Sequence, residues 1–219
     1  MANAVQKVNG IDIGDIQAIN GITDDNLQAL NALEFTGVTD AHTLIATATS
    51  DGSDATLGFT SGIDSTYDVY EFIFTNIHPE TSDQDFEFQV STGSGFDQLN
   101  ITSTFFYAYN PEGGGTANVV YVAEEDQHNT AGYQHLVPHQ GGAAEESLSG
   151  VLTLYAPSST TYVKHFMARF NGNLLGEYSI GNHIAGYINT TSAIDEIDFK
   201  FASGEIQGGE IKMYGLAKS

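Results

Sequence analysis

The segment Asp85-Phe86-Glu87-Phe88-Gln89-Val90-Ser91 alternates polar and apolar residues without interruption. Successive side chains of a β-strand point to opposite faces of a sheet. Phe86, Phe88 and Val90 therefore share one face, and the polar residues between them share the other. This period of two predicts a strand with one buried face.

The same signals recur along the chain. Toward the C-terminus, apolar residues are spaced mainly two apart at Ile194, Ile197, Phe199, Phe201, Ile211, Met213 and Leu216. Runs rich in β-branched and aromatic residues predict further strands wherever Gly, Asn, Asp, Ser and Thr clusters separate them. With Asp85–Ser91, the predicted strands are His42–Thr49, Tyr67–Ile77, Asn100–Asn110, Ala117–Glu124, Ser147–Pro157, Thr161–Asn171, Glu177–Asn189, Ala193–Ala202 and Glu210–Leu216.

These strands are short, and almost no stretch of the chain has helical periodicity. Turn signals lie between them, for example at Asn110–Gly115 and at Gly141-Gly142. The combination is typical of an antiparallel sandwich or barrel. We expect an all-β fold, a jelly-roll-like β-sandwich, over Val38–Ser219. The segment Glu124–Glu146 has the weakest strand signal, and we expect a long polar loop there.

Residues 1–37 differ from this domain because they contain an 11-residue repeat. Its pattern is apolar-Gln-x-apolar-Asn-Gly-apolar, and its copies are Val5–Ile11, Ile16–Ile22 and Leu27–Leu33, with Ala32 replacing Gly in the last. The apolar residues before Asn are three apart, which puts them on one face of a helical turn. Asp15 and Asp25 could cap two of these turns. A tight hairpin at Asn-Gly is the alternative.

Each repeat is too short to bury its own apolar residues, so we expect residues 1–37 to form an anchoring arm that docks on something larger. A flexible leader is the alternative, but a leader does not need regularly spaced apolar positions. The residues predicted to anchor the arm are Val5, Val8, Ile11, Ile16, Ile19, Ile22, Leu27, Leu30 and Leu33.

The chain is strongly acidic, with six Lys and Arg against 28 Asp and Glu and a formal net charge of −22. Nucleic acid binding depends on neutralising phosphates with Lys and Arg, so the composition argues against it. Anionic membrane surfaces are disfavoured for the same reason. The acidity favours solubility in salt, and a basic partner or divalent cations are the alternatives. The chain contains no Cys, which excludes disulfides and thiolate sites.

Targeting signals are also not recognisable. The segment Met1–Gly21 lacks a basic region followed by an apolar core, so we expect no signal peptide. No run reaches about 18 consecutive apolar residues, so we expect no membrane span. The protein should be made in a cytoplasm and reach an exterior location only by lysis.

Histidines and acidic clusters are the candidate metal ligands of the chain. His135 and His139 are four apart and His128 is near, but Pro138 disfavours the helix that would bring the first two together. We therefore expect no metal at the histidines. The acidic clusters could hold calcium, but none of the clusters fits the full pattern of a calcium-binding loop. We favour the interpretation that they are solvated turns. These clusters are Asp24-Asp25, Asp51–Asp54 and Asp83–Asp85.

No catalytic motif is evident, and we expect the protein not to be an enzyme and to need no cofactor. Ser61 and Ser149 lack the Gly-x-Ser-x-Gly pattern, and no phosphate-binding glycine loop is present. A carboxylate pair for glycoside cleavage stays open, because such a pair forms only in the fold.

The aromatic run Phe105-Phe106-Tyr107-Ala108-Tyr109 is a candidate surface for stacking against sugars. In a strand, Phe105, Tyr107 and Tyr109 share one face. The favoured interpretation is that one face packs in the core and the other contacts a neighbouring sheet or subunit.

Several segments resemble virion structural proteins of tailed bacteriophages, especially those of phages that infect marine bacteria and cyanobacteria. They are Lys7–Ile11, Ala18–Ile22, Tyr70–Pro79, Tyr155–Phe166, Ala185–Ile194 and Gly208–Leu216. The resemblance covers most of the chain and implies a structural role in the particle, without catalytic residues.

On that resemblance we expect a capsid decoration or cement protein, or a head or tail fibre subunit, exposed on the virion and anchored by residues 1–37 to other capsid or tail proteins. The arm's unburied apolar repeat and the sheet edges of the domain favour a homo-oligomer, and we expect a homotrimer. A receptor- or glycan-binding module at a fibre tip is the alternative, and a glycosidase of tailspike type is the least favoured.

Overall fold

The computed structural model describes residues 42–93, 95–96 and 98–216, together with six two-residue strands nearer the N-terminus. The chain divides into two compact units, Met1–Thr43 and Leu44–Ser219. Within the described residues, the structure contains no helix with the length and hydrophobicity that a membrane span requires.

The N-terminal unit contains three separate two-stranded antiparallel ribbons. They are β1 (Lys7–Val8) with β2 (Ile11–Asp12), β3 (Ala18–Ile19) with β4 (Ile22–Thr23), and β5 (Ala29–Leu30) with β6 (Leu33–Glu34). The pairings Val8↔Ile11, Ile19↔Ile22 and Leu30↔Leu33 leave two residues between the strands of each ribbon. The hairpin alternative is therefore confirmed and the helical turn is wrong. Asn-Gly, which favours a two-residue hairpin connection, stands between the strands in the first two ribbons, and Asn31-Ala32 stands there in the third.

The second unit is all-β and antiparallel, and each predicted strand overlaps an observed one. Its first elements are β7 (His42–Thr49), β8 (Leu57–Phe59), β9 (Val69–Pro79), β10 (Gln84–Ser91), β11 (Asn100–Pro111), β12 (Asn118–Tyr121) and the short 3₁₀ helix η3 (Ala123–Glu125). The remaining strands are β13 (His128–Ala131), β14 (Gln134–Gln140), β15 (Leu148–Tyr155), β16 (Lys164–Leu174), β17 (Tyr178–Ile188), β18 (Glu196–Phe201) and β19 (Ile206–Leu216).

The prediction of a long loop over Glu124–Glu146 is wrong, because β13 and β14 occupy much of that segment. Hydrophobic alternation does not reveal β14, since two of its fully buried side chains are the amides of Gln134 and Gln140. Both are hydrogen-bonded: Gln134 Nε2 donates to the carbonyl of Glu125 at 3.0 Å, and Gln140 Nε2 donates to that of Asn173 at 2.9 Å. These bonds offset part of the loss of water on burial, although the buried Oε1 atom of Gln140 has no hydrogen-bond partner.

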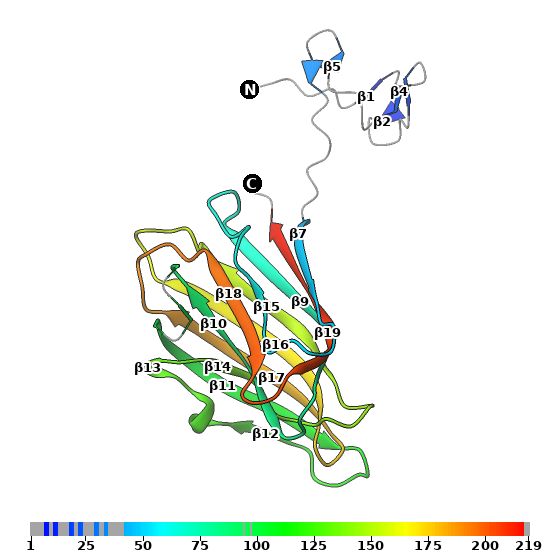
Figure 1. The fold of residues 1–219 in the computed structure, drawn as a ribbon, viewed down its shortest axis with the longest axis vertical. Coiled ribbons are helices and arrows are strands. Elements are labelled where there is room, and N and C mark those ends of the chain that lie inside the picture. The colour runs from blue at the N-terminus through cyan, green and yellow to red at the C-terminus, as the bar shows by residue number, and fades with distance from the viewer. Residues whose placement is uncertain are drawn as a thin grey trace. The chain divides into compact units, whose positions relative to one another are not determined.

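The strands form one sheet that curls until it is nearly closed into a barrel (Figure 1). Its larger part has the order β7-β19-β9-β15-β16-β17-β11, with β12 and β13 on β11. Its smaller part has the order β14-β10-β18-β8, and it joins the larger part through the pair Gln140↔Leu174 of β14 and β16. Near the opposite edge, Asp54 forms a bridge with Ile206 of β19, so the gap in the barrel is narrow.

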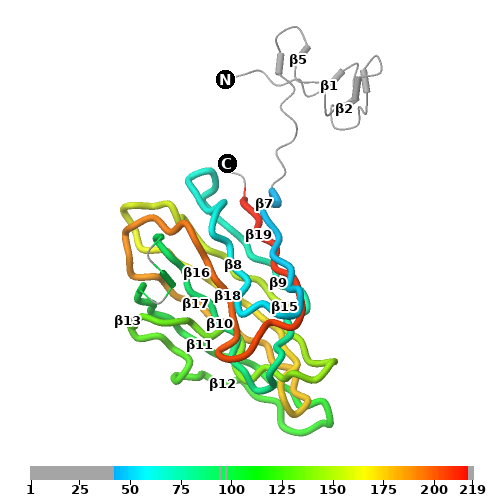
Figure 2. Tube along the Cα trace, viewed as in Figure 1, coloured from blue at the N-terminus to red at the C-terminus, as the bar shows by residue number. Residues whose placement is uncertain are grey.

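The core lies between the two parts of the sheet, which the tube trace shows curling over one another (Figure 2). Phe74 of the larger part contacts Phe199 of the smaller part at a ring-centroid distance of 4.8 Å, and Phe166 contacts Phe88 at 5.0 Å. These rings are almost entirely shielded from solvent. Aromatic pairs of this kind add about 1 kcal/mol each beyond the burial of their area. The alternation that predicted Asp85–Ser91 as a strand thus reflects packing of Phe86 and Phe88 in this core.

Candidate binding groove on the outer face of the sheet

The outer face of the larger part, which points away from the core, carries side chains in rows because neighbouring strands are in register. One row runs from β9 to β12 and contains Ile73, Val151, Arg169, His183, Phe106 and Tyr121. The next row contains Glu71, Thr153, Met167, Ala185 and Thr104. Residues distant in sequence are thereby brought side by side.

A groove of about 370 Å³ lies over these two rows. Ala185 keeps the middle of the groove low, because its small side chain is flanked by Met167 and Thr104 on the neighbouring strands. Met167 is 56% exposed and Phe106 43% exposed. A second hollow shares Thr104, Met167 and Ala185 and extends the depression along the strands toward His165 and Tyr187. Large apolar side chains thus remain in contact with solvent on one continuous surface.

One side of the groove has a flat aromatic wall. The rings of Phe106 and His183 stack at a centroid distance of 4.9 Å with an angle of 6° between their planes. The two residues are cross-strand partners on β11 and β17, which fixes their separation. Tyr155 and Met167 contribute to the other side, where the Tyr155 hydroxyl lies 3.9 Å from the Met167 sulfur. The groove therefore has aromatic side chains on facing sides, with Met167 beside Tyr155.

Arg169 supplies the positive charge of the groove, and it is the single arginine of the sequence. Other cations that the structure describes are already bonded. Lys164 donates to two backbone carbonyls, Lys200 lies 3.4 Å from Glu87, and Lys212 lies 2.8 Å from Glu210. None of the salt bridges or side-chain hydrogen bonds of the described residues involves the Arg169 guanidinium. An exposed, uncompensated cation therefore lies among aromatic rings.

The predicted stacking aromatics occupy different environments. Phe105 is fully buried in the core, so it is not available to a ligand on the surface. Tyr107 and Tyr109 are partly buried and line a separate hollow of about 360 Å³ with Tyr178. Phe106, on the other face of the same strand, is the ring that lines the groove. The sequence identified the aromatic strand, but the exposed ring in the groove, Phe106, is on the face opposite the predicted stacking residues.

The predicted anchoring residues are placed only in part. Val8, Ile11, Ile19, Ile22, Leu30 and Leu33 lie in the three hairpins of the N-terminal unit. Val5, Ile16 and Leu27 lie outside the described residues. The anchoring role stays a prediction.

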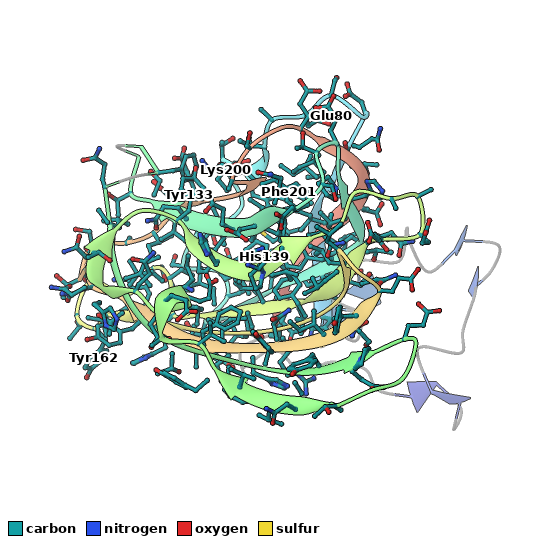
Figure 3. The ribbon with its side chains drawn as sticks, turned by 90° about the horizontal axis from the view of Figure 1, so that it is seen from below. Glu80, Tyr133, His139, Tyr162, Lys200 and Phe201 are labelled. Carbon is teal, nitrogen blue, oxygen red and sulfur yellow. The ribbon has the colours of Figure 1, made fainter. Side chains whose placement is uncertain are left out.

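Two candidate histidines, His135 and His139, lie near carboxylates on the smaller part of the sheet, where Figure 3 labels His139, Tyr133 and Lys200. The third, His128, begins β13 in the larger part of the sheet. His135 Nδ1 is hydrogen-bonded to Glu125, and its Nε2 lies 3.4 Å from Glu87. The hydrogen bonds to Glu125 and then Glu87 raise the pKa of His135 to about 10. His139 Nδ1 lies 2.8 Å from Asp83, which raises the pKa of His139.

No group of three or more His, Asp or Glu in the described part of the chain is arranged to hold a metal ion. In the cluster Asp51–Asp54, the carboxylates accept hydrogen bonds from the turn itself. Asp51 Oδ1 accepts from Ser53 Oγ at 2.7 Å, and Asp54 Oδ2 accepts from the amide of Asp51 at 2.8 Å. Asp85 accepts a bond of 2.9 Å from the amide of His139. Asp24 and Asp25 lie outside the described residues.

The sequence alone does not identify Arg169, His183, Met167 and Tyr155 as members of one site. A signal was present within Thr161–Asn171, where Phe166, Ala168 and Phe170 alternate with Met167 and Arg169. The uniqueness of Arg169 on the polar face of that predicted strand could have directed attention to it. Its neighbours on β17 and β11 follow only from the strand pairing.

Comparison of this chain with protein-family models, with curated proteins and with solved structures found no match in any of the three searches.

Proposed function

We propose that this chain is a non-enzymatic structural protein of a tailed-bacteriophage virion, either a capsid decoration or cement protein or a fibre subunit. It would be made in the host cytoplasm and displayed on the particle. The observation that carries this proposal is the division of the chain into a unit of repeated hairpins and a unit with a complete β core. The resemblance of segments such as Tyr70–Pro79 to phage particle proteins supports the same role.

The repeated hairpins support anchoring because each is marginal alone. A ribbon of two two-residue strands provides one apolar cross-strand pair, such as Ile19↔Ile22. Isolated two-stranded hairpins are barely stable in water. Docking of all three on a particle surface would bury these pairs together. The arm of residues 1–37 would thus hold the β domain outward from the capsid or tail. A jelly-roll-like sandwich remains the finer expectation for the fold of that domain.

Self-association into a trimer is also part of the proposal. Strand β12 pairs with β11 on one side, and its residues Val119 and Tyr121 are 65% and 58% exposed. An interface between copies would cover this edge and these side chains.

The test is removal of residues 1–37 from the gene in its phage, followed by mass spectrometry of purified particles. We expect the truncated chain to be lost from particles because its docking hairpins are gone. A matched variant, Arg169→Gln, alters the outer face of the domain and should be incorporated normally. Equal incorporation of the truncated and full-length chains would refute anchoring by the arm.

A second candidate function is supported by the groove. A receptor- or glycan-binding module needs an exposed, preformed surface with aromatic and polar groups. The stack of Phe106 on His183 beside Arg169 has this composition. Adsorption of phage to host cells should then be inhibited by the purified full-length chain, and lack of inhibition would argue against this function.

A further inference from the structure

We propose that the groove around Arg169 binds a saccharide that carries a carboxylate group. In this assignment the Arg169 guanidinium holds the carboxylate, and the Phe106–His183 stack and Tyr155 flank the sugar ring. The inference rests on the second candidate function, recognition by the groove, and it is independent of anchoring by the arm.

The charge of the groove points to an anionic group on the ligand. Arg169 stays protonated at all physiological pH values, and its planar fork matches the two oxygens of a carboxylate. In a chain of net charge −22, carboxylates are abundant, yet within the described residues none is bonded to this guanidinium. The cross-strand neighbours of Arg169 are Val151 and His183, so nothing on the adjacent strands neutralises it.

The end of the groove away from Arg169 carries a negative charge, which would orient a ligand that has one acidic end. Glu71 lies on β9 in the neighbouring row, where its cross-strand partners are Thr153 and Tyr214. A carboxylate there repels a second carboxylate but accepts hydrogen bonds from hydroxyl groups. A ligand with an acid group near Arg169 and hydroxyl groups near Glu71 and Thr153 satisfies both ends.

The flanking surfaces suit a ring with apolar faces and polar edges. Phe106 and His183 form a flat stack, and Met167 and Tyr155 lie across Ala185 from it. Small-molecule sites combine such apolar walls with a few polar groups, and they typically have volumes of roughly 300–1,000 Å³. The groove, with about 370 Å³, is at the lower end of that range and is continued by the second hollow. A short oligosaccharide has the required length and ring faces.

The position of the groove in the sheet disfavours a peptide. Peptides that add to sheets pair with an exposed strand edge. Strands β15, β16 and β17 are each paired on both sides, so their backbone groups are already hydrogen-bonded. Recognition here must use side chains.

The charge of the chain also disfavours nucleic acid as the occupant of the groove, because a net charge of −22 repels its phosphates.

The experiment is calorimetric titration of the full-length protein with trigalacturonate and, separately, with 3′-sialyllactose. Each probe has a control that lacks only the negative charge or the acidic sugar: the methyl ester of trigalacturonate, and lactose. We expect binding of at least one acidic probe and affinity about tenfold lower for its control, because one charge-assisted contact is lost. Equal affinity for acid and control, or no binding of either acid, would overturn the proposal.

Two variants locate the binding. Arg169→Gln should weaken binding of the acidic probe about tenfold, as expected for loss of one charge-assisted pair. Lys212→Gln removes the same charge from the same face of the sheet, but Lys212 is already paired with Glu210 and does not line the groove, so its binding should be unchanged. Equal effects of the two variants would show that net charge, not the groove, controls binding.

A measurement on the unaltered protein avoids any folding defect of the variants. Phenylglyoxal modifies arginine, and Arg169 is the single arginine, so one adduct detected by mass spectrometry reports on this site. The acidic saccharide should slow its formation, whereas the neutral control should not. If Arg169→Gln instead dissociates an oligomer in sedimentation experiments and no saccharide protects Arg169, the face is a contact between copies and the proposal is wrong.

Discussion

Lys200, Glu87 and His135 form a row of alternating charge across β18, β10 and β14. The row is continued by Glu125 of η3, which bonds to the other nitrogen of His135. Asp85 lies 3.9 Å from the same ring. Because carboxylates surround the imidazole, they stabilise its protonated form, and the pKa of His135 is raised from 6.5 to about 10. This residue connects the short η3 segment to the smaller part of the sheet.

The raised pKa predicts a specific dependence of stability on pH. The charged His135 stabilises the fold fully below its ordinary pKa of 6.5, and this contribution is lost as the pH rises toward about 10. Replacing His135 by Gln should lower the free energy of unfolding by about 2 kcal/mol near neutral pH. Urea denaturation between pH 6.5 and about pH 10 should also show that the free energy of unfolding changes less with pH in the variant than in the unaltered protein. The same substitution at the exposed His128 is the control, and an equal loss there would contradict this account.

At the scale of elements, β9 and β19 contain an irregularity that the alternation pattern does not reveal. Their register shifts between Gly208 and Glu210, opposite Asn76 and Ile77. Gly209 has a φ of +109°, and a Cβ on it would lie 2.6 Å from the carbonyl oxygen of Asn76. A bulge at this position needs glycine, because a side chain would be strained in conformation and would also clash with β9.

Two adjacent glycines provide a matched test of this bulge. Gly209→Ala should reduce the free energy of unfolding by about 2 kcal/mol or more, owing to the left-handed conformation and the close approach. Gly208→Ala should have little effect, because a Cβ there would meet no atom within 4 Å. Chemical denaturation of both variants measures the difference. Similar losses in the two would show that helical or strand propensity, not the bulge, determines the effect.

Strands were predicted correctly where buried and exposed side chains alternate. Prediction failed where buried polar side chains or turn preferences determine the structure. The alternation in Asp85–Ser91 follows directly from the core, and the strand is observed. In β14, hydrogen-bonded Gln134 and Gln140 occupy buried positions, so the pattern was hidden. In the N-terminal repeat, apolar spacing favoured a helical turn, but the turn preference of Asn-Gly determined the structure. Hydrogen bonds between a buried polar side chain and residues distant in the sequence cannot be seen in the local sequence.

At the scale of the whole molecule, the groove depends on which strands are neighbours. Phe106 and His183 are adjacent because β11 pairs with β17, although a long chain segment separates them. Alternation can assign each side chain to a face, but it does not determine strand order. The all-β, antiparallel class of the fold was therefore predictable from the sequence, whereas the near closure of the sheet into a barrel and the position of the site required the topology.

The stability of the β domain should be independent of the arm. Every core residue that the structure describes lies between Leu57 and Met213. Removing residues 1–37 should therefore leave the thermal midpoint of the domain unchanged in calorimetry. Removing residues 1–49 also deletes β7 and should lower the midpoint. A lower midpoint after the shorter deletion would show that the arm contributes to the core.

Strand β7 also has a mechanical consequence. It is the first strand of the β domain, it lies at a sheet edge beside β19, and none of its residues is fully buried. The amide of Ser50 bonds to the carbonyl of Gly209, while β7 begins beside the end of β19 (Figure 1). A tensile force entering at residue 42 therefore loads the hydrogen bonds of β7 one after another, as in opening a zipper, and not all at once in shear. Under tension through the arm, β7 should peel away at low force and lengthen the tether while the aromatic core stays folded.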